Sequence, residues 1–231
     1  MKNTWKALGA IIIVAIVVLG LWSATAPHDK YKGFVTRVDV EFGPGEKELL
    51  EQQLAVLEQS LQQQEDAGGE IDSKLYVDIA QVANTLGDLV KAREMYELYF
   101  DYNVLDLAPR LNYGRVLLEM EDYKGAEEAY KQVLASGGAY EGTFRGLLDA
   151  ITEQNQEGKR DQDIKNTLDV ATEIVGQTPW LMAQLAEWYN AHGDCHQAIA
   201  HLQVIVGIAE SEDARNAARQ DIADLERTCK R

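Results

Sequence analysis

The side chains with the most chemical potential lie near the C-terminus and are His192, Cys195, His196, His201 and Cys229. Imidazole and thiolate groups are common zinc ligands, so one reading of the run His-Gly-Asp-Cys-His is a metal site. Gly193 and Asp194 interrupt a helix within that run, however, so His192 and His196 do not share a continuous helical face. The chain also has no C-x-x-C pair. We therefore expect no metal and no cofactor, and interpret the histidines as surface residues of a turn.

The two cysteines are the only ones in the chain. Cys195 stands at the start of one expected helix and Cys229 at the end of the next, with a reversal near residues 210–212. In an antiparallel hairpin the two positions are at nearly equal distances from the turn, so they meet at one level. We expect a disulfide between them, which suits an oxidising compartment and excludes Cys195 as a metal ligand. The alternative is two buried, unpaired thiols.

The elements that would position these cysteines show a repeat. Three segments share one pattern, namely Gly87-Asp88-x3-Ala92-x3-Tyr96, Asp122-Tyr123-x2-Ala126-x3-Tyr130 and Gly193-Asp194-x3-Ala198-x3-Leu202. Ala92 and Ala126 are 34 residues apart, and Ala126 and Ala198 are 72 apart. The second spacing equals one unit of 34 and one of 38, which predicts an insertion in the polar stretch 154–161. We interpret Tyr96, Tyr130 and Tyr189 as packing residues.

A second pattern precedes each of these segments. It pairs a small residue with larger apolar ones on a single helical face, in Tyr76-x2-Ile79-Ala80-x2-Ala83, Tyr113-Gly114-x2-Leu117 and Met182-x2-Leu185-Ala186-x2-Tyr189. The small residue allows a neighbouring helix to approach closely. Pro109 and Pro179 lie near the expected starts of such helices, where proline sacrifices no hydrogen bond.

Together these patterns resemble the tetratricopeptide repeat (TPR), a helix–turn–helix unit of 34 residues, over about residues 73–210. The resemblance implies an all-α solenoid domain over 46–231, with units at about 73–106, 107–138, 139–176 and 177–210 and a C-terminal capping helix at 212–229. The third unit is irregular. Its first helix is predicted from Phe144, Leu147, Leu148 and Ile151, and its second from Ile164, Leu168, Ala171 and Ile174 or Val175.

In proteins with this repeat, the first helices line a concave groove that holds a segment of another protein. The resemblance places Val77, Gln81, Asn84, Leu111, Arg115, Leu118, Phe144, Leu148, Trp180, Glu187 and Asn190 in that groove. Trp180 and Trp188 are either interface anchors or packing residues. Some family members clamp a C-terminal carboxylate with Lys and Asn on the first helix of the first unit. Val77 and Gln81 occupy those positions here, which argues against that mode.

The segment from Glu46 to about Asp66 is a further predicted helix, ended by Gly68-Gly69. Its apolar stripe consists of Leu50, Leu54, Leu57 and Leu61. We interpret the helix as the N-terminal cap of the solenoid. The alternative is a homodimer through the stripe, although fewer than two heptads are present.

Residues 7–26 carry no charge and are long enough to cross a bilayer. Trp5 and Trp22 bracket the stretch at interface positions, and Lys2 and Lys6 favour a cytoplasmic tail at residues 1–6. We expect a single-pass anchor with the solenoid extracytoplasmic, and periplasmic in a Gram-negative cell. A signal peptide cleaved after Ala24-Thr25-Ala26 and a buried soluble helix are the alternatives; Pro27 at the new N-terminus argues against cleavage.

Residues 27–45 would connect the anchor to the solenoid. Apolar and charged residues alternate there, as in a short strand, with Phe34, Val38, Val40 and Phe42 on one side. The segment could pack on the domain, add to a partner's sheet, or remain an extended connector. We favour the extended connector.

The chain of 231 residues has a formal net charge of -16, and its first 26 residues hold two lysines and no acid. Such a field repels phosphate backbones and anionic lipids, so we expect no nucleic-acid partner. A basic protein segment is a fitting partner, whereas a merely solvated surface is the simpler explanation. Phosphate-binding glycine loops and nucleophile elbows are absent, which argues against an enzyme. The favoured function is a membrane-anchored scaffold in envelope protein assembly or maturation; the alternative is a self-assembling structural protein.

Overall fold

The computed structural model describes residues 30–103 and 105–229. These residues form the helices α2 (Glu46–Ala67), α3 (Lys74–Thr85), α4 (Leu89–Tyr102), α5 (Leu107–Glu119), α6 (Tyr123–Ala135), α7 (Glu141–Glu153), α8 (Asp161–Val175), α9 (Pro179–Ala191), α10 (Cys195–Ile208) and α11 (Glu212–Thr228). A short 3-10 helix, Gln156–Gly158, lies between α7 and α8, inside the stretch where the sequence predicts an insertion. The predicted anchor at 7–26 lies outside the described residues, and within them no helix is long and apolar enough to span a bilayer.

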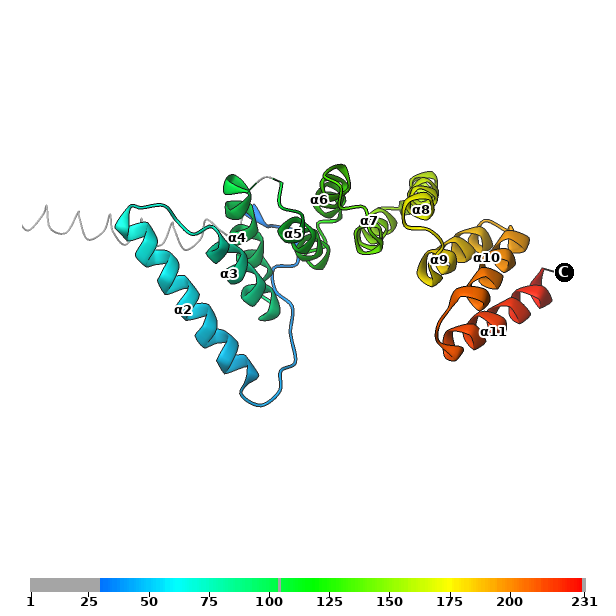
Figure 1. The fold of residues 1–231 in the computed structure, drawn as a ribbon, viewed down its shortest axis with the longest axis horizontal. Coiled ribbons are helices and arrows are strands. Elements are labelled where there is room, and N and C mark those ends of the chain that lie inside the picture. Colours follow the sequence, from blue (N-terminus) through cyan, green and yellow to red (C-terminus); the bar gives the residue numbers. More distant parts are fainter. Residues whose placement is uncertain (1–29, 104, 230–231) are drawn as a thin grey trace, which may run out of the picture.

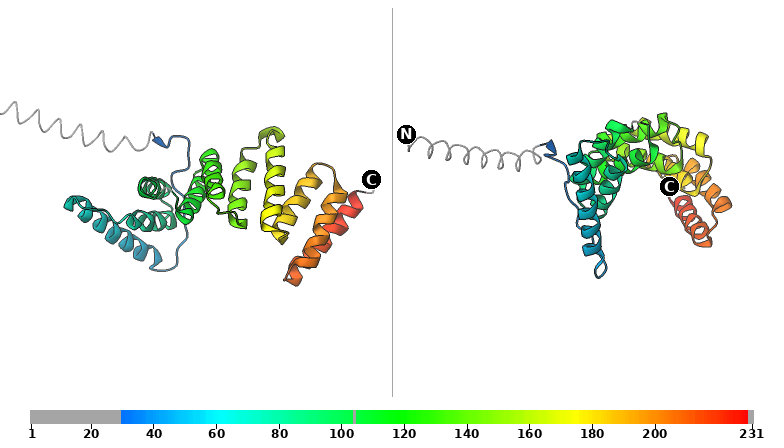
Figure 2. Two further views of the ribbon diagram at one scale, coloured as in Figure 1. Left: turned by 45° about the horizontal axis from the view of Figure 1, so that its top comes forward. Right: turned by 60° about the vertical axis from the view of Figure 1, so that its left-hand side comes forward.

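The helices are arranged as four stacked hairpins, α3–α4, α5–α6, α7–α8 and α9–α10, with one in each predicted unit. In Figure 1, α5, α7 and α9 lie along the lower side of the stack and α6 and α8 along the upper side. Figure 2 shows that the stack is arched, with α2 and the α10–α11 pair projecting from its two ends. Each hairpin contributes its inner face to an apolar core that continues into the next, so the all-α solenoid fold is confirmed.

The aspartate of the repeated motif has a local role in this fold. Asp88, Asp122 and Asp194 each precede a second helix and accept a hydrogen bond of 3.1 Å from the backbone N–H of Lys91, Gly125 and Gln197, respectively. A side-chain oxygen at this position satisfies an N–H that the helix leaves unpaired. The aspartate therefore recurs because it stabilises the start of the second helix in three of the four hairpins. In the irregular third unit Arg160 stands there and makes no such bond.

The alanines of the motif mark tight helix crossings. Ala92, Ala126 and Ala198 have no exposed surface. Ala126 packs with Leu117 of α5 and Ile151 of α7 in one core cluster. Replacing it with leucine is expected to overpack this crossing and to lower the free energy of unfolding by about 1–3 kcal/mol. Ala135→Leu is the control, because Ala135 is exposed on the same helix. Equal denaturation midpoints for the two variants would argue against the TPR register.

The connector that we expected to be extended packs on the domain. The side chain of Tyr31 is only 2% exposed, and the backbone N–H groups of Val35 and Val38 donate to the carbonyls of Met120 (2.9 Å) and Gly87 (3.0 Å). Gly87 has φ +77°, and a Cβ there would lie 2.1 Å from the Val38 carbonyl oxygen. The favoured interpretation is therefore wrong for this stretch, because alternation of residue types cannot reveal a surface that accepts the segment.

The helix α2 covers the open end of the first hairpin. Leu54, Leu57 and Leu61 of its stripe pack with Tyr76 and Ile79 of α3. Most of the stripe is therefore occupied within the chain, as a capping helix requires, and is not free for the homodimer contact.

A nearly buried carboxylate explains how the irregular third unit is held. Glu127 of α6 is 7% exposed and receives two hydrogen bonds from the Arg160 guanidinium, at 2.6 and 2.9 Å. Lys131 and Gln154 donate to the same carboxylate at 2.6 and 2.9 Å. These bonds lower the pKa of Glu127 to about 2, with the Arg160 contact as the largest cause. The carboxylate thus ties both ends of the insertion to α6.

Candidate functional site

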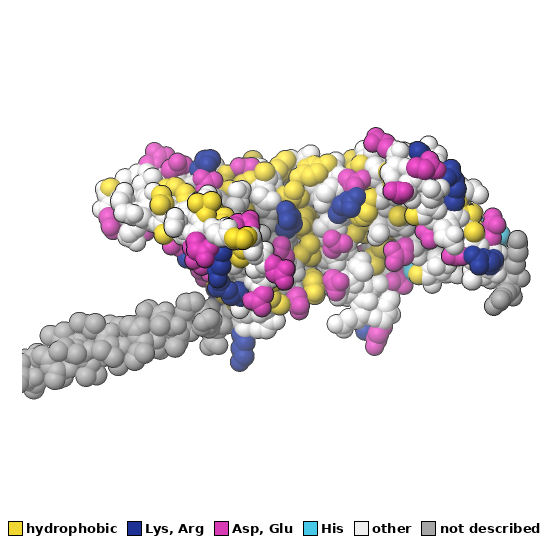
Figure 3. All heavy atoms as spheres, turned by 90° about the horizontal axis from the view of Figure 1, so that it is seen from below, with side chains coloured by type: hydrophobic (Ala, Val, Ile, Leu, Met, Phe, Trp, Pro, Cys, Tyr) yellow, Lys and Arg dark blue, Asp and Glu magenta, His cyan; other side chains and the backbone are white. Residues whose placement is uncertain are grey.

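The first helices of the hairpins face one side of the arch. Figure 3 views the molecule from that side and shows hydrophobic side chains gathered near its middle, with acidic and a few basic side chains among them. Hollows lie between successive first helices, at α3–α5 and α5–α7, and between α9 and α11. We take this concave face as the candidate site.

The hollow between α3 and α5 is polar and has a volume of about 280 Å³. It is lined by Gln81, Asn84, Thr85, Tyr96, Asn112 and Arg115. The Oδ1 atom of Asn84 is buried and has no hydrogen-bond donor within the described residues. An unsatisfied buried acceptor costs about 1–3 kcal/mol. A ligand that brings an N–H group to Asn84 would recover that cost.

The hollow between α5 and α7 is more apolar and has a volume of about 420 Å³. Leu111 and Leu118 form its apolar wall, and Arg115 connects it to the polar hollow. Tyr130 of α6 reaches its floor between two glycines, where a Cβ on Gly114 or Gly146 would lie 2.9 or 2.0 Å from the ring. The glycines thus allow a second-helix tyrosine to reach the concave face.

Charges of both signs surround this hollow. Glu119 and Asp149 line it, and desolvation between the helices raises the pKa of each carboxyl group. Arg115 forms no ion pair among the residues that the structure describes, whereas Arg145 is paired with Glu141. Arg115 is therefore the cation that remains available to an incoming group at the junction of the two hollows.

The face is interrupted between α7 and α9. There the Arg145 guanidinium stacks over the Trp180 ring at 4.4 Å from its centroid. Trp180 also packs against the core, and Trp188 donates to the Asp161 carbonyl at 3.3 Å. The two tryptophans are thus engaged within the chain, which favours the packing interpretation that the sequence left open.

Seven of the predicted groove residues line the hollows: Gln81, Asn84, Leu111, Arg115, Leu118, Glu187 and Asn190. Phe144 and Leu148 do not, because they are 1% and 4% exposed and belong to the core that α7 shares with α8 and α9. Val77 packs into the core around α3, and the stacked Arg145 covers Trp180. The predicted groove position is therefore wrong for Phe144 and Leu148, which are buried in the core, whereas Val77 and Trp180 are partly exposed and line none of the three hollows.

Sequence reasoning missed Tyr96, Asn112, Tyr130 and Arg145 on this face. The two tyrosines come from second helices, which we assigned to packing alone. A signal was present for Tyr130, because glycine stands at small-residue positions of both flanking first helices, 114 and 146. Burial raises the pKa of Tyr96 to about 12, so its hydroxyl stays protonated.

Replacement of Gly146 by alanine tests this floor. The new Cβ would lie 2.0 Å from the Cζ atom of Tyr130, so the ring must move. We expect the free energy of unfolding to fall by about 1–3 kcal/mol, even though alanine is the better helix former by about 1 kcal/mol. Gly142→Ala is the matched control on the same helix, because its Cβ would meet only the Tyr140 ring, at 3.6 Å. A gain in stability for both variants in denaturant titrations would contradict the position of the Tyr130 ring against Gly146.

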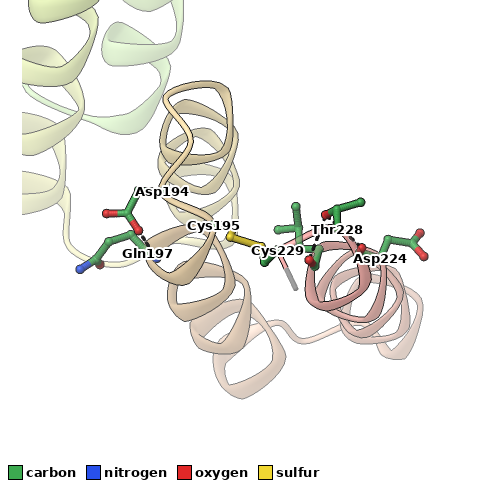
Figure 4. The surroundings of a disulfide bond; sticks show 7 residues. Asp194, Cys195, Gln197, Asp224, Thr228 and Cys229 are labelled. Atoms are coloured by element: carbon green, nitrogen blue, oxygen red, sulfur yellow. Dashed lines mark hydrogen bonds between the residues drawn. A yellow bond between two sulfur atoms is a disulfide. The ribbon is translucent and has the colours of Figure 1, made fainter. Parts of the chain in front are cut away.

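The cysteines lie at the far end of the solenoid. The Sγ atoms of Cys195 and Cys229 are 2.01 Å apart and the Cα atoms 6.2 Å apart, so the structure joins them as a disulfide between α10 and α11 (Figure 4). His192 instead contacts the Asp161 carboxylate at 3.0 Å and the Trp188 carbonyl at 2.7 Å, and these contacts raise its pKa. Within the described residues no cluster of three or more His, Cys, Asp or Glu side chains could hold a metal.

No family model matches the sequence, and no curated protein matches it. Solved structures do match the fold. MamA from Desulfovibrio magneticus RS-1, residue 41 to the end, superposes with a TM-score of 0.59 at 16% identity over 71% of this chain and 88% of its own. MamA AMB-1 gives 0.57 at 14% identity over 72% and 87%. Yeast Tom70 gives 0.58 at 12% identity over 82% of this chain and 45% of its own.

The chain has a TPR-like solenoid fold. At these identities the superpositions establish the fold alone.

Proposed function

We propose that this protein is a membrane-anchored, extracytoplasmic scaffold that binds a segment of another protein along its concave face. TPR-like solenoids generally mediate protein–protein interaction, and their curvature creates extended concave surfaces suited to it. The observation that carries the proposal is the connected pair of hollows over α3, α5 and α7, which offers polar groups at Asn84, Asn112 and Arg115 beside an apolar wall.

The chemistry of these hollows favours a peptide segment. A backbone N–H of the partner would satisfy the buried Oδ1 atom of Asn84, and an acceptor group would meet Arg115. One apolar side chain would fill the space beside Leu111 and Leu118. Pairing backbone groups with fixed side chains while burying one side chain is a common mode of peptide recognition.

The membrane position of the scaffold rests on the sequence. Residues 7–26 are apolar, and the cysteine pair suits an oxidising space outside the cytoplasm. We expect the full-length protein to resist carbonate extraction and to be accessible to protease from the outer side. A mature N-terminus at residue 27 would contradict the anchor and favour a cleaved signal peptide.

Photo-crosslinking in native membranes tests the binding face. A photoreactive residue at Leu118, on the concave face, is expected to capture a specific protein, and Arg115→Glu in the same chain is expected to abolish that product. The matched control is Val170, which is 46% exposed on α8 and lines none of the hollows. The same crosslinked protein from positions 118 and 170, or a crosslinked product that persists with Arg115→Glu, would contradict binding at the concave face.

The second candidate function is that of a structural membrane protein that assembles with copies of itself. Leu49 and Val56 of α2 are 65% and 62% exposed and lie seven residues apart, on one side of the helix. A second copy could cover them. Sedimentation over a range of concentrations would detect this, and a monomer that persists at high concentration would leave the binding scaffold as the only candidate.

A further inference from the structure

A third hollow lies at the C-terminal end of the solenoid, between α9 and α11. It has a volume of about 380 Å³ and is lined by Ala183, Ala186, Glu187, Asn190, Leu202, Asp221, Asp224 and Leu225. Its base is apolar, with Leu202 of α10 only 6% exposed. The two alanines of α9 are too short to reach α11, so the helices leave a space that suits one or two side chains.

The rim of this hollow is acidic. Glu187 contributes a carboxylate from α9, and Asp221 and Asp224 contribute two from α11, while no lysine or arginine lines the hollow. Asp224 is paired with Arg227. Glu187 and Asp221 have no ion-pair partner in the part of the chain that the structure describes. Carboxylates from α9 and α11 therefore lie around one apolar base. A bound cation would reduce the repulsion between these negative charges.

We propose that this hollow binds a partner segment in which an aliphatic side chain is flanked by lysine or arginine. The inference rests on the proposed scaffold function and gives it a second contact with defined chemistry. The aliphatic group fills the base formed by Leu202 and Leu225, and the flanking cations meet Glu187 and Asp221. Complementary charge at a rim sets the specificity and the association rate of such contacts.

Charge also decides against other occupants. A second copy of this chain would bring a further net charge of -16 to the acidic rim. Nucleic acid and anionic lipid surfaces would be repelled for the same reason. A basic segment of a different protein is the occupant that the rim attracts.

The disulfide maintains the wall that carries two of the three carboxylates. Ala218 is the one buried residue of α11, and Ala214, Ile222 and Leu225 pack beside it while remaining partly exposed, so one side of the helix stays open to solvent. Leu225 and Asp224 lie about one turn before Cys229, which is bonded to the start of α10. Loss of this bond would release the end of α11 that forms the hollow, and binding of the basic segment should weaken with it.

Fluorescence anisotropy with the full-length protein in detergent micelles tests the proposal. The probe is a labelled eleven-residue peptide with a central leucine flanked by two lysines on each side in a serine background. The matched probes replace the lysines with glutamate, or the leucine with serine. We expect the lysine–leucine probe to bind at least about tenfold more tightly than either matched probe, and to weaken as salt is raised.

Variants of the protein locate the binding. Glu187→Gln combined with Asp221→Asn is expected to weaken the lysine–leucine probe about tenfold, and reduction of the disulfide should weaken it as well. Glu226→Gln is the control, since Glu226 is exposed on α11 and does not line the hollow. Equal affinity of the double variant and the control, or no binding of any probe, would overturn the proposal.

The proposed function has a separate readout. Arg115→Glu should leave the affinity for the lysine–leucine probe unchanged, because Arg115 belongs to α5 and does not line the hollow beside α11. A probe that binds more tightly with Arg115→Glu and is unchanged in the double variant would move the basic segment to the central hollows. That result would overturn the C-terminal contact while supporting the scaffold.

Discussion

Reduction of the Cys195–Cys229 disulfide is expected to lower the free energy of unfolding by about 3–4 kcal/mol in the loop-entropy model. The bond spans a sequence separation of 34 and ties α11 to α10. Because Ala218 is the one buried residue of α11 and no later helix within the described residues covers it, the reduced protein should lose this helix first. Thermal unfolding with and without reductant measures the loss, and limited proteolysis should then cut between 212 and 229 before any other helix.

The cysteines themselves provide the control for this experiment. Protein purified from its native compartment should contain no free thiol until it is reduced, and Cys229→Ser should reproduce the effect of reductant. Alkylation of both cysteines in the native, unreduced protein would contradict the bond. It would also weaken the assignment of an oxidising location outside the cytoplasm.

Replacement of Glu127 by alanine is expected to cost about 1–3 kcal/mol, because its donors lose a charged acceptor while Arg160 stays partly exposed and keeps its contact with Asp163. The substitution removes the carboxylate that receives Arg160, Lys131 and Gln154 and leaves the guanidinium without its bidentate partner. The insertion between α7 and α8 should loosen, which hydrogen exchange of residues 154–161 would detect. Glu128→Ala is the matched control, because Glu128 is exposed next to it and should change stability by less than about 0.5 kcal/mol.

The Glu127 effect should depend on pH in one direction. Its pKa falls from 4.5 to about 2 on folding, so the carboxylate stabilises the folded protein fully above about pH 5. As the pH falls from about 4.5 towards 2, the unfolded chain takes up a proton that the folded chain does not, and the stabilisation is lost. The stability difference between wild type and Glu127→Ala should therefore be constant near neutral pH and shrink in acid. A difference that grows in acid would contradict the assigned ion pair.

The amino-acid sequence by itself determined the helical hairpins and their period. Ala92, Ala126 and Ala198 mark close crossings and an aspartate precedes the second helix in the same three hairpins, so both signals are local and readable within one unit. The spacing of the repeated alanines also located the insertion before α8. The pairing of Cys195 with Cys229 followed from the fixed antiparallel register of two helices joined by a short turn.

Only the tertiary structure decided which faces remain open. Helical periodicity places Phe144 and Leu148 on one side of α7, but it does not say that neighbouring helices cover that side. The burial of Tyr31 and the contact of Val38 with Gly87 depend on a surface built by later residues. The acidic rim combines carboxylates from α9 and α11, which are brought together by packing on α10. Burial and charge clustering are properties of surfaces from distant segments, and a local pattern carries no information about them.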